Sequence, residues 1–227
     1  MTGLAQRRQP PLLHGAVPAA CLLLALSVQA EIIDRITANV DSSVITQSEV
    51  ERQIRVTAFQ DGVPPDLSPK HKQDTLQTLI DQKLIQRDLE NSRYPLPDPA
   101  ELNPVIDQFR KEHYPSQAAF EAALKQYGIT EKDLRDLLLW QRTLLSFIEV
   151  RFAPGLQVSD KEISDYFEKT VKPAAQAAHP GQPVNLDDYR DQIEKKLEGE
   201  RVDRQLDTWL KGARRRAHVV VHEEALR

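Results

Sequence analysis

Helix-start signals followed by apolar residues at helical spacing run through this chain and restrict what it can fold into. Ser159 is followed three positions later by Glu162, which is the capping-box pattern, and Thr46 with Glu49 repeats it. Ser68 precedes a proline at the first helical position, another helix-start signal. Comparable starts and apolar stripes predict helices that begin near residues 46, 68, 98, 116, 130, 159 and 186. We therefore expect a mainly α fold, built as a helical bundle.

The helix predicted from Thr130 to about Phe152 is the most apolar of the series. Its polar face is narrow and consists of Arg135, Arg142 and Glu149. A helix that is apolar over most of its circumference is usually buried on several sides, so we expect this one at the centre of the bundle. The helix predicted from residue 98 is expected to bury Leu102, Val105, Ile106 and Phe109.

Segments with strand character lie at both ends of the predicted helices. Ile32–Val40 mixes β-branched and polar residues, Val44-Ile45 begins a short return strand after a turn, and Ala217–Val221 predicts a closing strand. Strands this short are not stable alone, so we expect the closing strand to pair with Ile32–Val40. The last helix and strand follow a proline-rich segment, so a homodimer formed by swapping this C-terminal element is also plausible.

The first thirty residues have the order of parts of a secretory signal peptide. Arg7 and Arg8 give a positive start, and Ala16–Leu26 is an apolar run of about eleven residues. Small side chains then predict cleavage between Ala30 and Glu31. The apolar run is far shorter than the roughly 20 residues of a membrane-spanning helix. We predict that residues 1–30 are removed on export and that the product is not stably inserted in a membrane.

Charge and cysteine content exclude several classes of function. The whole chain has a net charge of −4, and loss of Arg7 and Arg8 with the signal peptide makes the remainder two units more negative. That balance disfavours nucleic acid as a partner. The single cysteine, Cys21, lies in the predicted signal peptide, so the product has no thiol for disulfides, catalysis or metal binding.

No motif in the sequence predicts catalysis or a cofactor. His218 and His222 fall on one face of the predicted closing strand, but a third metal ligand at suitable geometry is not evident. The carboxylate pair Asp133/Asp136 is typical of a solvated helix surface with ion pairs one turn apart. The basic run Arg214–Arg216 fits a helix C-terminus, where positive charge complements the dipole, with contact to anionic lipid or an acidic partner as the alternative. We predict no catalytic, cofactor-binding or metal-binding residue.

Aromatic residues near the predicted helix ends are candidates for contact with a client polypeptide, because a peptide groove requires some accessible apolar surface. Packing in the core is the competing explanation for each of them. The candidates are Phe59, Tyr94, Phe109, Tyr114, Phe120 and Tyr127.

The segment Ile33–Val50 (IDRITANVDSSVITQSEV) resembles the opening of the SurA-type periplasmic chaperones. The order of helices up to residue 171 is also similar, and Trp209–Val221 resembles the family's C-terminal return to the core. In that family the helix starting at Ser159 leads into a parvulin-type prolyl isomerase domain. Here the stretch at 172–185 has three prolines and four alanines and is too short for such a domain, so we expect a linker in its place and no enzyme activity.

This resemblance implies a SurA-core type of bundle divided into an N-terminal chaperone region at 31–171, the linker at 172–185 and a C-terminal helix and strand at 186–227. It also implies an ATP-independent chaperone in the periplasm that holds unfolded polypeptides, particularly outer-membrane protein precursors, in a helical groove. The alternative is a scaffold or assembly subunit that uses the same groove for one dedicated partner.

Overall fold

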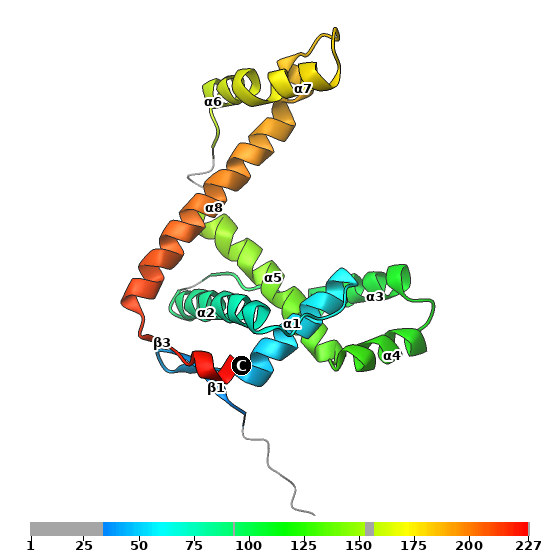
Figure 1. Ribbon diagram of the computed structural model, residues 1–227, viewed down its shortest axis with the longest axis vertical. Coiled ribbons are helices and arrows are strands. Elements are labelled where there is room, and N and C mark those ends of the chain that lie inside the picture. The colour runs from blue at the N-terminus through cyan, green and yellow to red at the C-terminus, as the bar shows by residue number, and fades with distance from the viewer. Residues whose placement is uncertain (1–33, 93, 153–156, 227) are drawn as a thin grey trace, which may run out of the picture. The chain divides into compact units, whose positions relative to one another are not determined.

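The computed structural model describes residues 34–92, 94–152 and 157–226. The predicted signal peptide at 1–30, its cleavage between Ala30 and Glu31, and the first residues of the strand predicted at 32–40 lie outside these ranges. Helices form most of the described chain and accompany one small sheet (Figure 1). The predicted mainly α fold with a small β element is confirmed.

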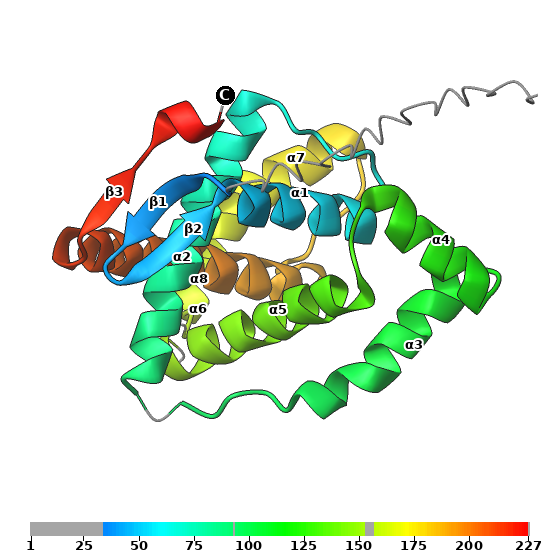
Figure 2. The same cartoon turned by 90° about the horizontal axis from the view of Figure 1, so that it is seen from below.

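The sheet joins the two ends of the described chain. β1 (Ile36–Val40), β2 (Ser43–Thr46) and β3 (Val219–Val221) pair antiparallel in the order β2-β1-β3. Ala38 lies opposite Val221 and Val40 opposite Val219, so the predicted pairing of the C-terminal strand is confirmed within one chain (Figure 2).

β1 is shorter at its start than the predicted strand. Asp34 and Arg35 lie outside the strand, although the Arg35 carbonyl accepts from the backbone N–H of Gln47 at 2.8 Å. The Asp34 carboxylate accepts one hydrogen bond from the backbone N–H of Ser48 at 3.1 Å and another from the Ser48 hydroxyl. Inside β1 the buried hydroxyl of Thr37 donates to the carbonyl of Ile45 at 2.9 Å. The one polar side chain in this part of the core is thereby satisfied.

The first two helices begin at the residues that the sequence indicates. Thr46 caps α1 (Gln47–Asp61) by accepting from the backbone N–H of Glu49. Ser68 caps α2 (Pro69–Glu90) in the same way at His71. α1 ends at Gly62, whose φ of 68° is the left-handed conformation that glycine adopts without strain.

α3 (Leu102–His113) follows a 3-10 turn at Pro99–Glu101, and α4 (Gln117–Tyr127) begins after the cap Ser116. Leu102 and Ile106 are buried as expected, and Phe109 is half-buried. The predicted burial of Val105 is wrong, because this side chain is 40% exposed. Val105 lies about 60° from Leu102 around α3, at the border of the buried face.

α5 (Glu131–Phe152) is not enclosed by its neighbours, which corrects the prediction that it forms the centre of the bundle. Only Leu134, Leu137, Phe147 and Phe152 along this helix are buried. Leu145 is 66% exposed and Val150 is 49% exposed. α1, α3 and α8 contact α5, and the apolar residues that these helices do not cover remain at the surface.

The stretch predicted as a linker at 172–185 begins as a helix. α6 (Asp160–Tyr166) opens with the predicted capping box between Ser159 and Glu162, continues through a π-helical turn at Phe167–Val171, and leads into α7 (Lys172–Ala178). The alanines of this stretch are strong helix formers, and its first proline follows directly on the π-helical turn, where the regular i→i−4 hydrogen bonding is already interrupted. Only the remainder up to residue 185 is non-helical.

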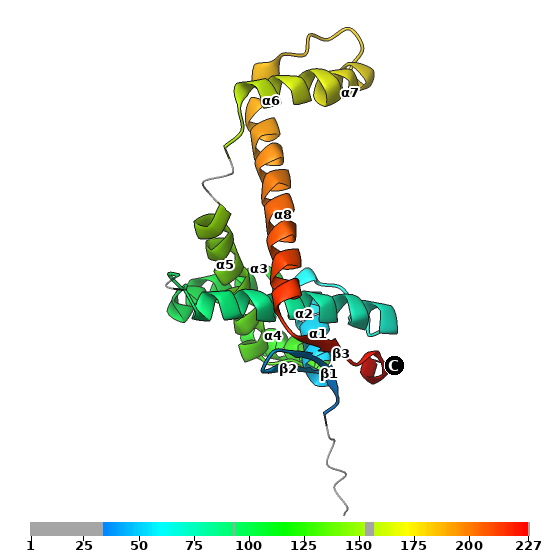
Figure 3. The same cartoon turned by 90° about the vertical axis from the view of Figure 1, so that its left-hand side faces the viewer.

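α8 (Arg190–Arg216) connects the α6 region to the sheet (Figure 3). Near its start, Ile193 packs with Ile163 and Phe167. Near its end, Trp209 packs between α2 and α5 residues, and the basic run Arg214–Arg216 occupies the last turn as predicted. Within the part of the chain that the structure describes, no helix is long and apolar enough to cross a bilayer.

Candidate functional site

The described residues show no arrangement typical of catalysis. No group of three or more His, Cys, Asp and Glu side chains in that part of the chain is placed to hold a metal ion. The histidines considered as a possible metal-binding pair are His218 and His222. His222 contacts the side-chain amide of Asn39 at 3.1 Å and lies 3.8 Å from the carboxylate of Glu224. The lowered carboxylate pKa values arise from caps and surface ion pairs, as at Glu162, where hydrogen bonds from Ser159 lower the pKa.

Five of the six aromatic candidates form one cluster where α1, α3 and α4 meet. Phe59 is at its centre, with ring centroids 5.8 Å from Tyr114, 6.0 Å from Phe120, 5.9 Å from Phe109 and 5.3 Å from Tyr127. Phe59 is 2% exposed and Phe120 is fully buried, so these two are core residues in this structure.

The remaining aromatic side chains of the cluster are half-buried. The hydroxyl of Tyr127 donates to the carbonyl of Val63 at 3.1 Å, and burial raises the pKa of Tyr114. Tyr94 lies apart from the cluster, against Phe147 at 5.7 Å. The six candidates therefore do not line one common surface.

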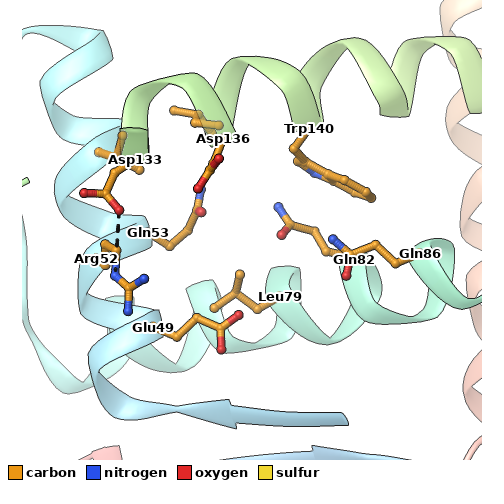
Figure 4. A pocket seen from close by; sticks show the side chains of 11 residues that line it. Glu49, Arg52, Gln53, Leu79, Gln82, Gln86, Asp133, Asp136 and Trp140 are labelled. Atoms are coloured by element: carbon orange, nitrogen blue, oxygen red, sulfur yellow. Dashed lines mark ion pairs between the residues drawn. The ribbon is translucent and has the colours of Figure 1, made fainter. Parts of the chain in front are cut away.

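A groove between α2 and α5 offers the accessible surface that the aromatic cluster lacks. α1 and α8 each pack against both α2 and α5 and hold these two walls. Its first part, next to α1, has a volume of about 320 Å³. In Figure 4 Asp136 and Trp140 on α5 face Gln82 and Gln86 on α2, while Glu49 and Arg52 of α1 are at one end.

The second part of the groove is mainly apolar and has a volume of about 570 Å³. Gln86, Asp136 and Trp140 line both parts, so the two adjoin. We call the whole feature the α2–α5 groove. Its second part is lined by Gln86, Leu89, Glu90, Leu96, Pro97, Pro99, Asp136, Leu139, Trp140 and Thr143.

The local sequence explains why this surface stays open. The connection from α2 to α3 contains Pro95, Pro97 and Pro99, which lack the N–H that helix continuation needs. The hydroxyl of Ser146 on α5 donates to the carbonyl of Pro95 at 3.3 Å and holds this connection beside α5. Leu96 is left 65% exposed at the edge of the groove.

The polar groups of the groove are uncharged amides and charged side chains. Within the described chain, Gln82 and Gln86 have no side-chain hydrogen bonds, so their amides are free to donate and accept. Asp133 lies 4.0 Å from Arg52, Glu49 lies 3.2 Å from Lys83, and Asp136 pairs with Lys132 at 2.5 Å. Glu90 has no ion pair among the described residues.

The lining of this groove has groups that match an extended polypeptide. Amide side chains match backbone N–H and C=O groups without regard to sequence, and the apolar part accepts side chains. Sequence reasoning misses the site because it places the whole of α5, Trp140 included, at the centre of the bundle. The signal that points to the groove is the excess of apolar residues on α5 together with the proline-rich connection at 95–99.

Comparison with known proteins shows similarity to proteins named Chaperone SurA. The chain is 28% identical to that of Pseudomonas aeruginosa over 151 residues, which are 63% of this chain and 36% of the relative. It is 28% identical to that of Pseudomonas putida over 160 residues, 68% of this chain and 35% of the relative. It is 26% identical to that of Alkalilimnicola ehrlichii over 167 residues, 69% of this chain and 37% of the relative.

The chain thus spans about a third of the length of the curated relatives it matches. No family model matches it. Over the matched residues the chain is SurA-like.

Proposed function

We propose that this protein is a chaperone that holds unfolded or extended polypeptides in the α2–α5 groove. The observation that carries the proposal is the groove of two adjoining parts, with its free amides on one wall and Leu96, Leu139 and Trp140 in its apolar part. The relatives named Chaperone SurA support the same function.

The groove suits weak, reversible binding, which an ATP-independent chaperone requires. Leu89 in its second part is buried and Leu139 and Trp140 are half-buried already, so a client gains only the area that these residues and the exposed Leu96 still present to solvent. At about 25 cal/mol per Å² of apolar surface, such a contact is modest. A client that buries the same side chains by folding is therefore released by its own folding.

The periplasm is the proposed location, with outer-membrane protein precursors as the proposed clients. Both rest on the predicted export signal at 1–30 and on the resemblance of Ile33–Val50 to the SurA-type chaperones. An exported protein whose single cysteine, Cys21, is removed with the signal cannot form wrong disulfides in an oxidising compartment. In the proposed division at 31–171, 172–185 and 186–227, the middle stretch is too short for an isomerase domain, so we propose no enzyme activity.

The test is suppression of aggregation. An outer-membrane β-barrel protein is diluted from urea into buffer without ATP, and light scattering is followed with increasing amounts of this protein. We expect scattering to fall as the chaperone approaches stoichiometric excess. Undiminished scattering at that excess would contradict the proposal.

A pair of variants locates the activity in the groove. Leu96→Ser removes an exposed apolar side chain at the groove edge and should weaken client holding by about 1 kcal/mol, roughly fivefold. The matched control is Val105→Ser, which removes an exposed apolar side chain of α3 outside the groove. Equal activity of the two variants would place client binding elsewhere.

A pull-down separates the chaperone from the scaffold alternative. Recovery of many unfolded polypeptides supports a chaperone. Recovery of one folded partner in a stoichiometric complex would favour a scaffold or assembly subunit.

A further inference from the structure

We propose that the α2–α5 groove selects client segments in which an apolar side chain is separated by one residue from a lysine or arginine. This inference rests on the proposed function and specifies the class of segment that the groove holds. It comes from the charges that line the apolar part of the groove.

Carboxylates approach the apolar part from both walls. Glu90 lies on α2 and Asp136 on α5, and among the described side chains that line this part none is basic. Glu90 is exposed and has no ion pair within the described chain, while Asp136 has its partner Lys132 on the solvent side, with a side chain that is 79% exposed. A client cation that enters here finds acceptors, and a client carboxylate meets like charge.

The neighbouring part of the groove has the same bias. Of the described side chains that line it, Glu49, Asp133 and Asp136 are acidic and Arg52 is basic. Glu49 pairs with Lys83 and Asp133 with Arg52, so among the described lining residues the Asp136 side of the groove has no cation. The shared residues Asp136 and Trp140 therefore mark a boundary where an apolar surface meets a carboxylate.

The spacing across this boundary matches an extended chain. Asp136 and Trp140 are one helical turn apart on α5, about 6 Å along the helix axis. In an extended segment, side chains two residues apart point to the same side and lie about 6.6–6.8 Å apart. A client residue that covers Trp140 thus places its second neighbour at Asp136. From Trp140 toward Asp136, the preferred client sequence is therefore an apolar residue, any residue, and then a basic residue.

Exposure to solvent limits how strongly the groove can prefer a basic client residue. Ion pairs between exposed side chains stabilise by amounts that correspond to about a twofold to fivefold change in affinity, and salt weakens them. The groove is therefore expected to prefer such segments without depending on them, as suits a protein that holds many clients.

The experiment uses three peptides that differ at one position. Each has two Phe-Ser-X units in a Gly/Ser background, with X as Lys, Ser or Glu. The chain has two tryptophans, Trp140 in the groove and Trp209 between α2, α5 and α8, so the two indole N–H signals in NMR give a site probe and an internal control. We expect Trp140 to shift with all three peptides, with the Lys peptide about tenfold tighter than the Glu peptide at low salt and the difference lost at high salt.

Variants of Glu90 and Asp136 test whether these carboxylates cause the preference for the Lys peptide. Glu90→Gln and Asp136→Asn should each reduce the ratio of the Lys-peptide affinity to the Ser-peptide affinity. Asp107→Asn is the matched control, because this carboxylate of α3 is exposed, pairs with Arg110 and lies outside the groove. It should leave this ratio unchanged.

The outcomes separate this inference from the proposed function. Equal affinity for the three peptides, with Trp140 responding to each, would overturn charge selection and leave the groove as a client site. No response of Trp140 to any peptide would overturn both. A shift of Trp140 with protein concentration alone would identify a second copy of this chain as the occupant and overturn the inference.

Discussion

Arg214, in the last turn of α8, donates to the carboxylate of Asp81 on α2 at 2.7 Å. The same guanidinium also reaches the side-chain and backbone oxygens of Gln77, at 2.7 and 3.1 Å. One side chain thus fixes the end of α8 to α2 just before the chain enters β3. This contact joins the C-terminal element to the rest of the core in the same chain.

Arg214→Ala should destabilise the fold. Three hydrogen bonds to partly buried partners are lost, and Asp81 loses its counter-charge, so we expect a loss of about 1–2 kcal/mol in the free energy of unfolding. Urea denaturation monitored by circular dichroism measures it. Lys211→Ala is the control, because this side chain and its partner Asp207 are 66% and 59% exposed and the pair contributes little. Equal midpoints for the two variants would contradict the role of Arg214.

Asp41 should make stability depend on pH. The backbone N–H of His218 and the guanidinium of Arg87 bond its carboxylate, and these interactions lower the pKa of Asp41. A carboxyl group with a lowered folded-state pKa stabilises the fold above its ordinary pKa of about 3.9, and this contribution is lost as pH falls through the folded-state value. The difference in unfolding free energy between the wild type and Asp41→Asn should therefore shrink on acidification from neutral pH. A difference that is constant down to pH about 3 would contradict this account.

Features set by local chemistry could be predicted from the sequence. Thr46, Ser68, Ser116 and Ser159 all cap the helices that follow them, because a cap needs only its own side chain and a backbone N–H three residues on. The pairing of β3 with β1 could also be predicted. A short strand is not stable unpaired, and the strand predicted at the other end of the chain is the partner available to it.

Features set by the number of neighbours could not be predicted. The sequence of α5 is equally apolar whether the helix is enclosed or exposed on one side. The positions of α1, α3 and α8 determine which of its apolar residues are buried. Sequence reasoning therefore encloses Trp140 with the rest of its helix and misses the α2–α5 groove. The aromatic candidates show the opposite error, because residues predicted to be accessible are buried. Phe59 and Phe120 pack against each other in a cluster that their sequence spacing does not reveal.

The capping box at Ser159 gives a local stability prediction. Its hydroxyl accepts from the backbone N–H of Glu162, and the Glu162 carboxylate accepts from the Ser159 backbone N–H at 2.9 Å. Ser159→Ala should cost about 1 kcal/mol of helix stability and speed amide hydrogen exchange in α6. Ser164→Ala, at an exposed position in the same helix, is the control and should leave exchange unchanged. Slower or equal exchange in Ser159→Ala would exclude the cap as a stabilising element.

Phe59→Leu distinguishes a core residue from a client contact. The ring packs against the other four aromatic residues of its cluster and is 2% exposed, so its loss should lower the unfolding free energy by about 1–2 kcal/mol. Because Phe59 does not line the α2–α5 groove, the folded variant should suppress client aggregation as well as the wild type does. Measurement of both quantities on one sample decides between the two roles. Normal stability with weakened suppression would show that Phe59 contacts clients directly and that the aromatic cluster opens to admit them.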